Sequence, residues 1–497
     1  HCGQCKLRYL TSYKIRSLHV FWHNDTTIII RDENPERKGM GAKQQIYTAG
    51  VLYYTVLKIR TDFRKGRQED VMERNDPRYQ AYVEILKEEL IPAMGCTEPI
   101  ALAYAAAKAR EVLGVLPDSV QLQVSGSIIK NVKSVIVPNT GHLKGMEAGV
   151  AAGIIAGSAE KELEVISEVS EEKKSAIRDY LQTVPITIEH TEQGHVFDIV
   201  VTERCGQDYA RVRIADYHTN ICRIEKNGTV LYEVPLLDET VQEDARADRS
   251  LLNMQDIWDF AETADLRDVA DLLERQIRYN NAIAEEGLLG DYGANIGRVL
   301  LTTYGNDVSN RAKAKAAAGS DARMNGCELP VIINSGSGNQ GITCSVPLIE
   351  YAKELHSGKE KLYRALIISN LVAIHEKTGI GTLSAYCGAV SAGAGAGAGI
   401  VYLCGDGYQA AIHTVVNALA IVSGIVCDGA KASCAAKIAS SVDAALLGYN
   451  MYKCNQEFKG GDGIVMKDIE TTIKGIGRLG KDGMRQTNEE IIRLMMS

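Results

Sequence analysis

Aromatic residues are scarce in this chain: Phe, Trp and Tyr make up 6% of its 497 residues, and only two of them are tryptophan. Positive charge is not in excess either, since the formal net charge is −8 at pH 7. An acidic balance offers no electrostatic footprint for nucleic acid. The first residues lack the apolar stretch and small-residue cleavage site of a secretory signal peptide. We therefore expect neither a nucleic-acid partner nor secretion.

Several cofactor-binding patterns are missing as well. Residues 334–341 (NSGSGNQG) are rich in Gly, but no Lys follows where a Walker loop requires one. The same stretch lacks the third Gly and the strand–helix context of a dinucleotide fingerprint. The lysines are plentiful, but none lies in a distinctive apolar motif, so we expect no pyridoxal phosphate.

Cysteine, in contrast, is abundant, with twelve residues scattered mostly through apolar patterns. This distribution is unlike a small secreted disulfide scaffold and favours reduced thiols in a cytoplasmic protein. Cys427 and Cys434 lie seven apart in a loop rich in Gly, Ala and Ser, and Cys387 precedes them by forty residues. Three thiolates suit a metal or iron–sulfur site with one open position. The spacing matches no zinc-finger or ferredoxin pattern, so three buried thiols packed as small hydrophobes are the alternative.

Two uncharged runs, residues 378–405 and 408–427, raise the question of membrane spans. Gly-rich sequence interrupts them and the second contains His413, so we expect buried helices of a helical domain and no membrane span. The alternating Gly and Ala of residues 392–399 would let helices approach closely. Such Gly/Ala faces also allow a homodimer.

The patterns predict an α+β fold with a mostly helical C-terminal catalytic domain. Residues 1–71 carry an excess of Lys and Arg, with β-leaning pieces at 26–30 and 51–56, and we expect an appended leader with Met72 as the natural start. Residues 72–117 form a helical segment, expected to pack on the catalytic domain. Residues 118–235 form a smaller α+β domain with a mixed sheet, and residues 236–497 form the helical domain.

Within these domains, Thr97 is the predicted N-cap of an Ala-rich helix ending near Leu113, which places Cys96 at a helix N-terminus where a thiolate is favoured. Residues 118–137 alternate and predict strands, and a helix is predicted at 143–158. Five further strands follow between residues 186 and 232, the last two joined by a hairpin at Asn227-Gly228. Helices predominate after residue 237, with interruptions at 319–324 and 334–341.

Polar residues in these interruptions are candidate ligand contacts. Ser320 and Arg323 lie in the first, where the guanidinium could bind an α-carboxylate or simply follow a capping turn. The second presents amides and hydroxyls before a helix, which forms a cradle for a carboxylate or phosphate, or a polar turn. Its candidate residues are Asn334, Ser335, Ser337, Asn339 and Gln340. His218 leads into a strand and is either structural or catalytic.

Seven motifs together resemble one family. They are GCTEP at 95–99, KN at 130–131, VPNTG at 137–141, HTN at 218–220, SDARM at 320–324, NSGSGNQGIT at 334–343 and CDGAKASC at 427–434. The family is that of the L-cysteine desulfidases, distantly related to the iron–sulfur L-serine dehydratase alpha chains. The resemblance runs from about Met72 to the C-terminus and leaves out residues 1–71.

The resemblance implies an oxygen-sensitive [4Fe–4S] cluster held by Cys387, Cys427 and Cys434. Cys96 would be a fourth, displaceable ligand or an acid–base thiol. Catalytic roles fall to Cys96 and His218 in proton transfer and to Arg323 in holding the carboxylate. Substrate binding is assigned to the loop residues above and to Ser320, Asn139, Thr140 and Asn220 of the shared motifs.

Three functions follow from these expectations. The first is an L-cysteine desulfidase, which converts a small-molecule amino acid to hydrogen sulfide, ammonia and pyruvate. The second is a dehydratase of L-serine or another small β-substituted amino acid, because small pocket changes decide the leaving group. The third is a non-catalytic iron–sulfur sensor, against which the clustered polar loop argues.

Overall fold

The computed structural model describes residues 72–191, 195–236, 246–381 and 383–496, and the backbone of four strands within residues 1–71. The chain divides into two compact units, His1–Val71 and Met72–Ser497. In the first unit an antiparallel sheet has the order β1 (Gln4–Leu7), β2 (Leu18–His23), β3 (Thr27–Asp32), β4 (Gln45–Thr48). Strand β3 confirms the strand predicted at 26–30, whereas residues 51–56 lie outside the described residues.

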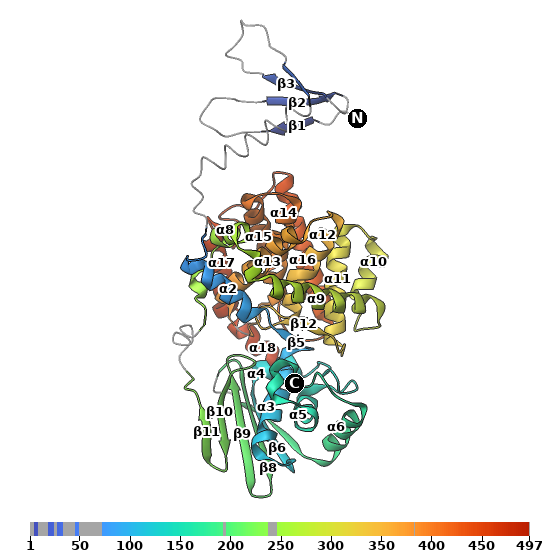
Figure 1. Ribbon diagram of the computed structural model, residues 1–497, viewed down its shortest axis with the longest axis vertical. Helices are drawn as coiled ribbons and strands as arrows, with labels where there is room; N and C mark the ends of the chain where they lie inside the picture. The colour runs from blue at the N-terminus through green and yellow to red at the C-terminus, as the bar shows by residue number, and fades with distance from the viewer. Residues whose placement is uncertain are drawn as a thin grey trace. The chain divides into compact units, whose positions relative to one another are not determined.

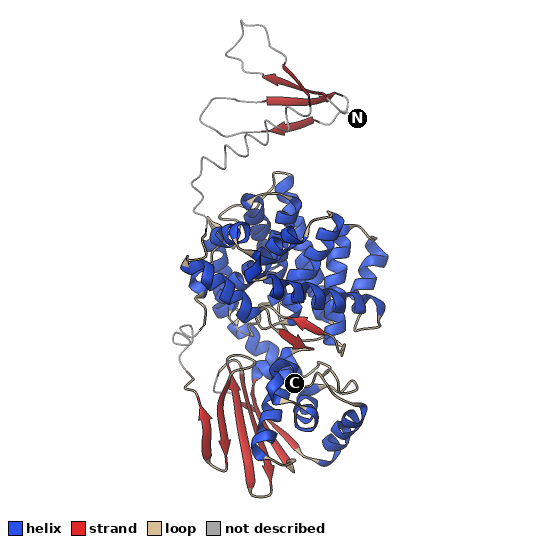
Figure 2. Ribbon diagram, viewed as in Figure 1, coloured by secondary structure: helices blue, strands red, loops and turns tan. Residues whose placement is uncertain are grey.

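The second unit consists of an α+β lobe (residues 97–233) and a helical lobe (Figures 1 and 2), which confirms the predicted fold class. The α+β lobe contains α3 (Thr97–Leu113), β6 (Ser119–Ser125), α4 (Gly126–Val132), α5 (Gly145–Ala156), η2 (Ala159–Glu164), α6 (Glu171–Thr183), β7 (Ile186–Thr191), β8 (Asp198–Cys205), β9 (Asp208–Ala215), β10 (Ile221–Lys226) and β11 (Thr229–Glu233). Its six-stranded sheet is mixed, in the order β11-β10-β9-β8-β6-β7, because β6 and β7 run parallel and the other neighbours antiparallel.

The helical lobe collects the remaining helices of residues 72–484. These are α2 (Pro77–Glu89), η4 (Arg249–Leu251), α8 (Met254–Thr263), η5 (Leu266–Asp268), α9 (Ala270–Leu289), α10 (Ile296–Tyr304), α11 (Val308–Met324), α12 (Gly338–Glu354), α13 (Lys359–Ile380), α14 (Gly388–Cys404), α15 (Tyr408–Val422), α16 (Ser433–Lys453), α17 (Ile469–Arg478) and η6 (Leu479–Gly483). Strand β5 (Pro92–Met94), which directly precedes α3 in the chain, pairs antiparallel with β12 (Pro330–Ile332), which precedes α12. The last helix, α18 (Arg485–Met496), packs on α4 of the α+β lobe.

Helix α14 occupies the centre of the helical lobe, in contact with α12, α13, α15 and α16. Its alternating glycines allow this: a Cβ at Gly393 would lie 2.8 Å from Ser441, and one at Gly399 would lie 2.6 Å from Leu348. The Gly/Ala face is therefore covered within the chain, and the homodimer stays a prediction. Among the described residues, no helix combines the length and the apolar character needed to cross a bilayer.

Helix α3 lies between the sheet and α5, and glycines on α5 set how closely it packs. A Cβ at Gly149 would approach the Pro99 carbonyl oxygen at 3.1 Å, and one at Gly153 would overlap that of Ala103. These glycines are four residues apart, so they line one helix face. Close packing fixes the position of α3, whose first turn carries the motif of residues 95–99.

The structure corrects four local predictions. Residues 126–132 form helix α4 and not strand; every residue of α4 is buried, so no amphipathic period marks it. Helix α11 continues unbroken to Met324, because the expected interruption is a buried helical turn. The N-cap of α3 is Cys96 and not Thr97. Sequence analysis also missed α6, which Ser170 caps through a bond from the Lys173 amide.

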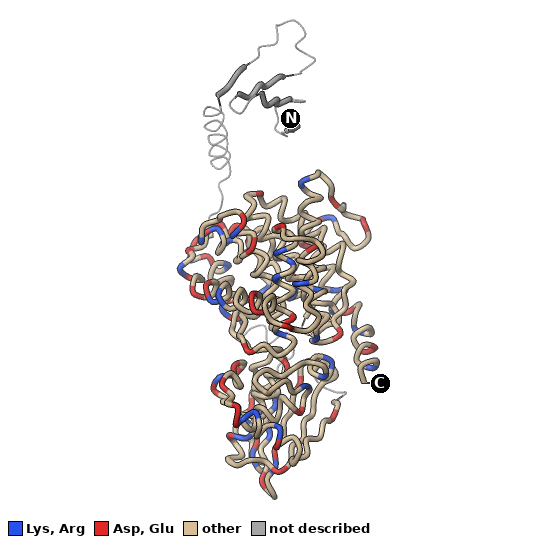
Figure 3. Tube along the Cα trace, turned by 90° about the vertical axis from the view of Figure 1, so that its right-hand side faces the viewer, with Lys and Arg blue, Asp and Glu red and all other residues tan. Residues whose placement is uncertain are grey.

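The hairpin prediction is confirmed. The hairpin at Asn227-Gly228 joins β10 and β11, with positive φ at both residues. The segment 72–117 divides: α2 packs against the helical lobe, and α3 packs on the sheet. Charged residues of both signs are interspersed over the two lobes (Figure 3).

Substituting Gly153 by Ala tests the α3–α5 packing. In an open helix interior Gly→Ala stabilises by roughly 0.5–1 kcal/mol. At Gly153 the new methyl meets backbone, so we expect a loss of roughly 1–3 kcal/mol in the free energy of unfolding, measured by urea titration. The matched control is Gly475→Ala in α17, where the nearest atom lies at 3.8 Å and no loss is expected. Equal stabilities for the two variants would contradict this packing.

Candidate active site

Two loops of the helical lobe bring Cys387 and Cys427 together. Tyr386 and Val426 form an antiparallel bridge, the Cys387 amide donates to the Ile425 carbonyl (3.1 Å), and the Cys427 amide donates to the Ala385 carbonyl (2.6 Å). Since successive residues of an extended segment face opposite sides, both cysteines lie on the face opposite Tyr386 and Val426. We call residues 383–387 the first cysteine loop and residues 425–434 the second.

Cys434 lies in the first turn of α16, at the end of the second cysteine loop, and its thiol faces the Gly429 carbonyl at 3.6 Å. Burial, together with the neighbouring thiols Cys427 and Cys434, raises the pKa of Cys387 to about 12. Burial likewise raises the pKa of Cys434, with Cys427 adding to the effect. The three thiols are thus close enough to influence one another's ionisation.

Two lysines flank these thiols, one half-buried and one buried. Lys377 of α13 bonds to the Gly381 carbonyl at the end of its own helix. Burial lowers the pKa of Lys377 to about 8, although Cys427 and Cys387 oppose this shift. Lys130 of α4, only 1% exposed, lies on the α+β side. Neither ammonium pairs with a carboxylate among the described residues, so the surroundings of the thiols favour an anion.

The donor set fits an iron–sulfur cluster better than a single ion. Among the residues that the structure describes, no three His, Cys, Asp or Glu side chains converge tightly enough to hold one metal ion. A cubane takes one thiolate at each iron corner, so its ligands need not converge on one point. Three half-buried thiols on two bridged loops, with cations beside them, have the chemistry of such a ligand set.

Opposite the thiols, in the α+β lobe, a buried carboxylate collects partners from three segments. The Cys96 thiol donates to Glu98 Oε2 (3.0 Å), and Asn131 Nδ2 donates to Oε1 (3.0 Å). His218 Nε2 lies 3.8 Å from the same Oε1. Burial alone would raise the pKa of Glu98, but His218 and Cys96 lower it to about 2. Glu98 is therefore an ionised carboxylate inside the protein.

Cys96 differs from the expectation of an activated thiolate. It does cap α3, but burial and the adjacent Glu98 charge raise its pKa well above the ordinary value, and Arg323 only partly opposes this. The thiol stays protonated and donates a hydrogen bond to Glu98. Burial of Cys96 raises its pKa more than the helix N-terminus lowers it.

His218 is held by its neighbours and keeps one ring nitrogen free. Phe197 packs edge-on against the imidazole at 4.7 Å between ring centroids. Asn220 stabilises the turn that carries His218, because its side-chain amide donates a hydrogen bond to the Ala215 carbonyl. His218 Nε2 is buried and makes no hydrogen bond among the described residues.

The loop of residues 334–341 lies between the two groups. Thr97 Oγ1 donates to the Gly336 carbonyl (3.0 Å), and a Cβ at Gly336 would lie 3.1 Å from His218. On the other side, a Cβ at Gly388, next to Cys387, would lie 2.6 Å from the Gln340 amide. The loop therefore touches the Glu98 group at one end and the first cysteine loop at the other.

Arg323 reaches this loop from α11, and its guanidinium makes no hydrogen bond or ion pair with the residues that the structure describes. Its side chain is 2% exposed, a Cβ at Gly338 would overlap Nε, and Nε makes no hydrogen bond among the described residues. Gln340 Oε1 and Asn339 Oδ1 are also buried without partners. Buried polar atoms are seldom left unpaired, so this group of a cation and two amide oxygens is suited to a polar ligand.

Four of the remaining predicted site residues have side-chain partners within the protein. Asn139 donates to the Ile166 carbonyl and Thr140 to that of Val137, in the turn beneath Gly95. Asn334 bonds to Asn370, Ser335 bonds to Asn334, and Ser337 is the N-cap of α12. Ser320 is buried in α11 with its hydroxyl unpaired. The structure does not bring Asn139 and Thr140 to the loop of residues 334–341.

Sequence analysis missed Glu98, Asn131, Lys130 and Lys377. The first three belong to quoted motifs, but a Glu in a first helical turn is also ordinary helix chemistry.

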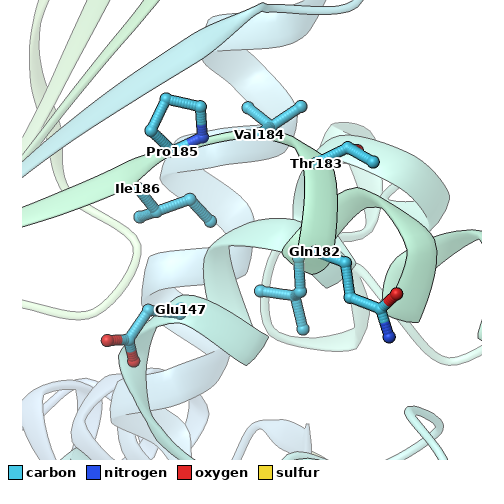
Figure 4. Close-up of a pocket in the computed structure, with 7 residues that line it drawn as sticks. Glu147, Gln182, Thr183, Val184, Pro185 and Ile186 are labelled. Atoms are coloured by element: carbon cyan, nitrogen blue, oxygen red, sulfur yellow. The ribbon is translucent and has the colours of Figure 1, made fainter.

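Surface hollows lie elsewhere: one of about 380 Å³ is lined by Glu147 and residues 181–186 (Figure 4), and one of about 450 Å³ is lined in part by Asn139 and His142.

Comparison with known proteins gives concordant results. The family model of the serine dehydratase alpha chain matches residues 160–493. A UPF0597 protein of Desulfitobacterium hafniense is 61% identical over 426 residues, covering 86% of this chain and 99% of the relative. UPF0597 proteins of Lachnoclostridium phytofermentans and Treponema denticola are 52% and 46% identical, covering 84% and 86% of this chain and 100% of each relative.

The ionised Glu98 makes stability depend on pH. Its folded-state pKa lies below the ordinary 4.5, so its charge stabilises the folded protein above about pH 4.5 and this contribution fades as the pH falls toward 2. Between about pH 6 and pH 3, wild type should lose on the order of 2 kcal/mol more in unfolding free energy than Glu98→Gln. Urea titration measures both. Glu111→Gln, an exposed change on the same helix, should follow wild type; a parallel pH response of wild type and Glu98→Gln would refute the assignment.

Proposed function

The chain belongs to the serine dehydratase alpha chain family, and from that premise we propose that it is an iron–sulfur lyase that eliminates the β-substituent of a small L-amino acid. L-Cysteine is the first candidate substrate, giving hydrogen sulfide, ammonia and pyruvate. One observation carries the proposal: three half-buried thiols, a guanidinium without a partner among the described residues and a carboxylate–imidazole pair meet around the loop of residues 334–341.

Cys387, Cys427 and Cys434 would hold the cluster, with the two lysines beside it. When bound, a [4Fe–4S] cluster with three thiolate ligands supplies a Lewis-acid iron with an open position. Cys96 bonds to Glu98 from the other lobe and is better suited to hold a proton than to ligate.

The unpaired groups match the two ends of an α-amino acid. The Arg323 guanidinium would bind the α-carboxylate, because a buried cation without a partner gains most from a carboxylate. The amide oxygens of Gln340 and Asn339 would accept hydrogen bonds from the α-ammonium. The site is lined by three glycines, Gly336, Gly338 and Gly388, at which a side chain would contact His218, Arg323 or Gln340. This close packing supports a small substrate.

His218 is the group best suited to remove the α-proton, since Nε2 makes no hydrogen bond among the described residues and lies 3.8 Å from the Glu98 carboxylate. The Glu98 carboxylate would stabilise the imidazolium that forms. The Cβ–S bond then breaks, HS⁻ leaves, and the 2-aminoacrylate that remains hydrolyses to pyruvate and ammonia. L-Serine elimination is the second candidate, favoured by the name of the family, and it would use the same residues.

Parallel anaerobic assays decide between the two substrates. Purified protein with iron and sulfide restored should be brown and should release pyruvate and sulfide from L-cysteine. Pyruvate from L-serine alone would move the assignment to a dehydratase, and colourless, iron-free protein would refute both.

Cys427→Ser should lose both colour and activity, because one of three ligands is removed. Iron content and visible absorbance measure the first, and pyruvate release the second. Cys454→Ser, an exposed cysteine at the end of α16, is the control and should behave as wild type. Full turnover by a colourless Cys427→Ser variant would rule out the cluster.

Arg323→Lys should raise KM by about tenfold or more, since a point charge replaces the two-pronged guanidinium at a buried carboxylate. Cluster absorbance should not change. The control is Arg311→Lys on the same helix, which pairs with Glu350 and Glu354 away from the site. An unchanged KM in the Arg323 variant would refute carboxylate binding at this position.

A further inference from the structure

Lys130 belongs to the α+β lobe but contacts the first cysteine loop of the helical lobe. Its ammonium donates to the Leu383 carbonyl (3.4 Å) and to Asn488 Oδ1 of α18 (2.6 Å). Both acceptors are neutral. Lys130 forms no ion pair with a carboxylate among the described residues, although it is 1% exposed.

The backbone of Lys130 contacts the second cysteine loop as well. Gly429, with φ +92°, packs so tightly against Lys130 that a Cβ would overlap the Lys130 carbonyl oxygen. The next residue, Asn131, donates to Glu98. One turn of α4 thus touches both cysteine loops and the proton-handling group.

A buried ammonium is costly unless an anion compensates it. Lys130 and, across the thiols, Lys377 meet only carbonyl and amide oxygens. Both ammonium groups lie beside the first cysteine loop, since Lys130 bonds to the Leu383 carbonyl and Lys377 bonds to that of Gly381. A cluster bound by the three cysteines of the two loops would supply the missing negative charge.

We propose that Lys130 is a positioning residue for the cluster: it supplies counter-charge from the α+β lobe and holds the two cysteine loops at the spacing the cluster needs. The cluster would then be retained only when α4 is seated against both loops. This inference rests on the proposed function, because it concerns the same three thiols.

The test compares Lys130→Met, Lys130→Arg and Asn488→Ala with Lys133→Met. Lys133 is the C-cap residue of α4, but its ammonium bonds to the Met495 carbonyl of α18, away from the cysteine loops. Two measurements are made: bleaching of cluster absorbance in air, and hydrogen exchange by mass spectrometry of the iron-free proteins.

We expect Lys130→Met to bleach about tenfold faster than wild type, because a buried counter-charge is lost. Lys130→Arg and Asn488→Ala should fall between the two, and Lys133→Met should match wild type. In the iron-free Lys130→Met protein, amides of residues 383–387 and 425–434 should exchange faster, with α9 and α12 unchanged.

Equal bleaching of Lys130→Met and Lys133→Met would overturn the proposal. If wild type binds no iron, the proposed function fails and the exchange measurement alone tests the role of Lys130. Faster exchange in both cysteine loops of Lys130→Met would support the positioning of the loops by Lys130. Unchanged exchange would overturn it. If Lys130→Met does not fold, the same criteria apply to Lys130→Arg and Asn488→Ala.

Discussion

The Glu98 carboxylate is an anion held out of water, and such a group persists only where every lone pair finds a partner. Its partners come from α3, α4 and the turn before β10, so these three segments must meet at one point. The glycines of α5 allow α3 to seat closely enough for this, and Phe197 supports the imidazole from behind. In the α+β lobe, the Glu98 carboxylate is thus held in place and already has its hydrogen-bond and ion-pair partners.

The helical lobe shows the opposite electrostatic condition. Among the described residues, the buried Arg323 and the half-buried Lys377 form no ion pair with a carboxylate, and Lys130 of α4 contacts the first cysteine loop. A site whose anion is paired and whose cations are not is prepared to receive negative charge. A substrate carboxylate at Arg323 and an anionic cluster at the thiols would supply it in two adjoining places.

Some of this arrangement could be predicted from the sequence. Asn227-Gly228 identified its hairpin, because that pair suits the positive φ of a tight turn. Helices α9 and α17 carried a clear amphipathic periodicity. Helix α4 did not, because it is buried on all sides, and Glu98 looked like an ordinary first-turn residue. Partners such as Asn131 and His218 depend on tertiary packing, which spacing along the chain does not encode.

Mössbauer spectroscopy of protein reconstituted with ⁵⁷Fe, with and without L-cysteine under anaerobic conditions, tests the central claim most directly. Three thiolates leave one iron of four with an open position, so substrate should change the spectrum of one iron site and leave the other three as they were. The same experiment with L-serine reports on the alternative substrate. A cluster whose four irons are unaffected by either amino acid, or the absence of any cluster, would contradict the account.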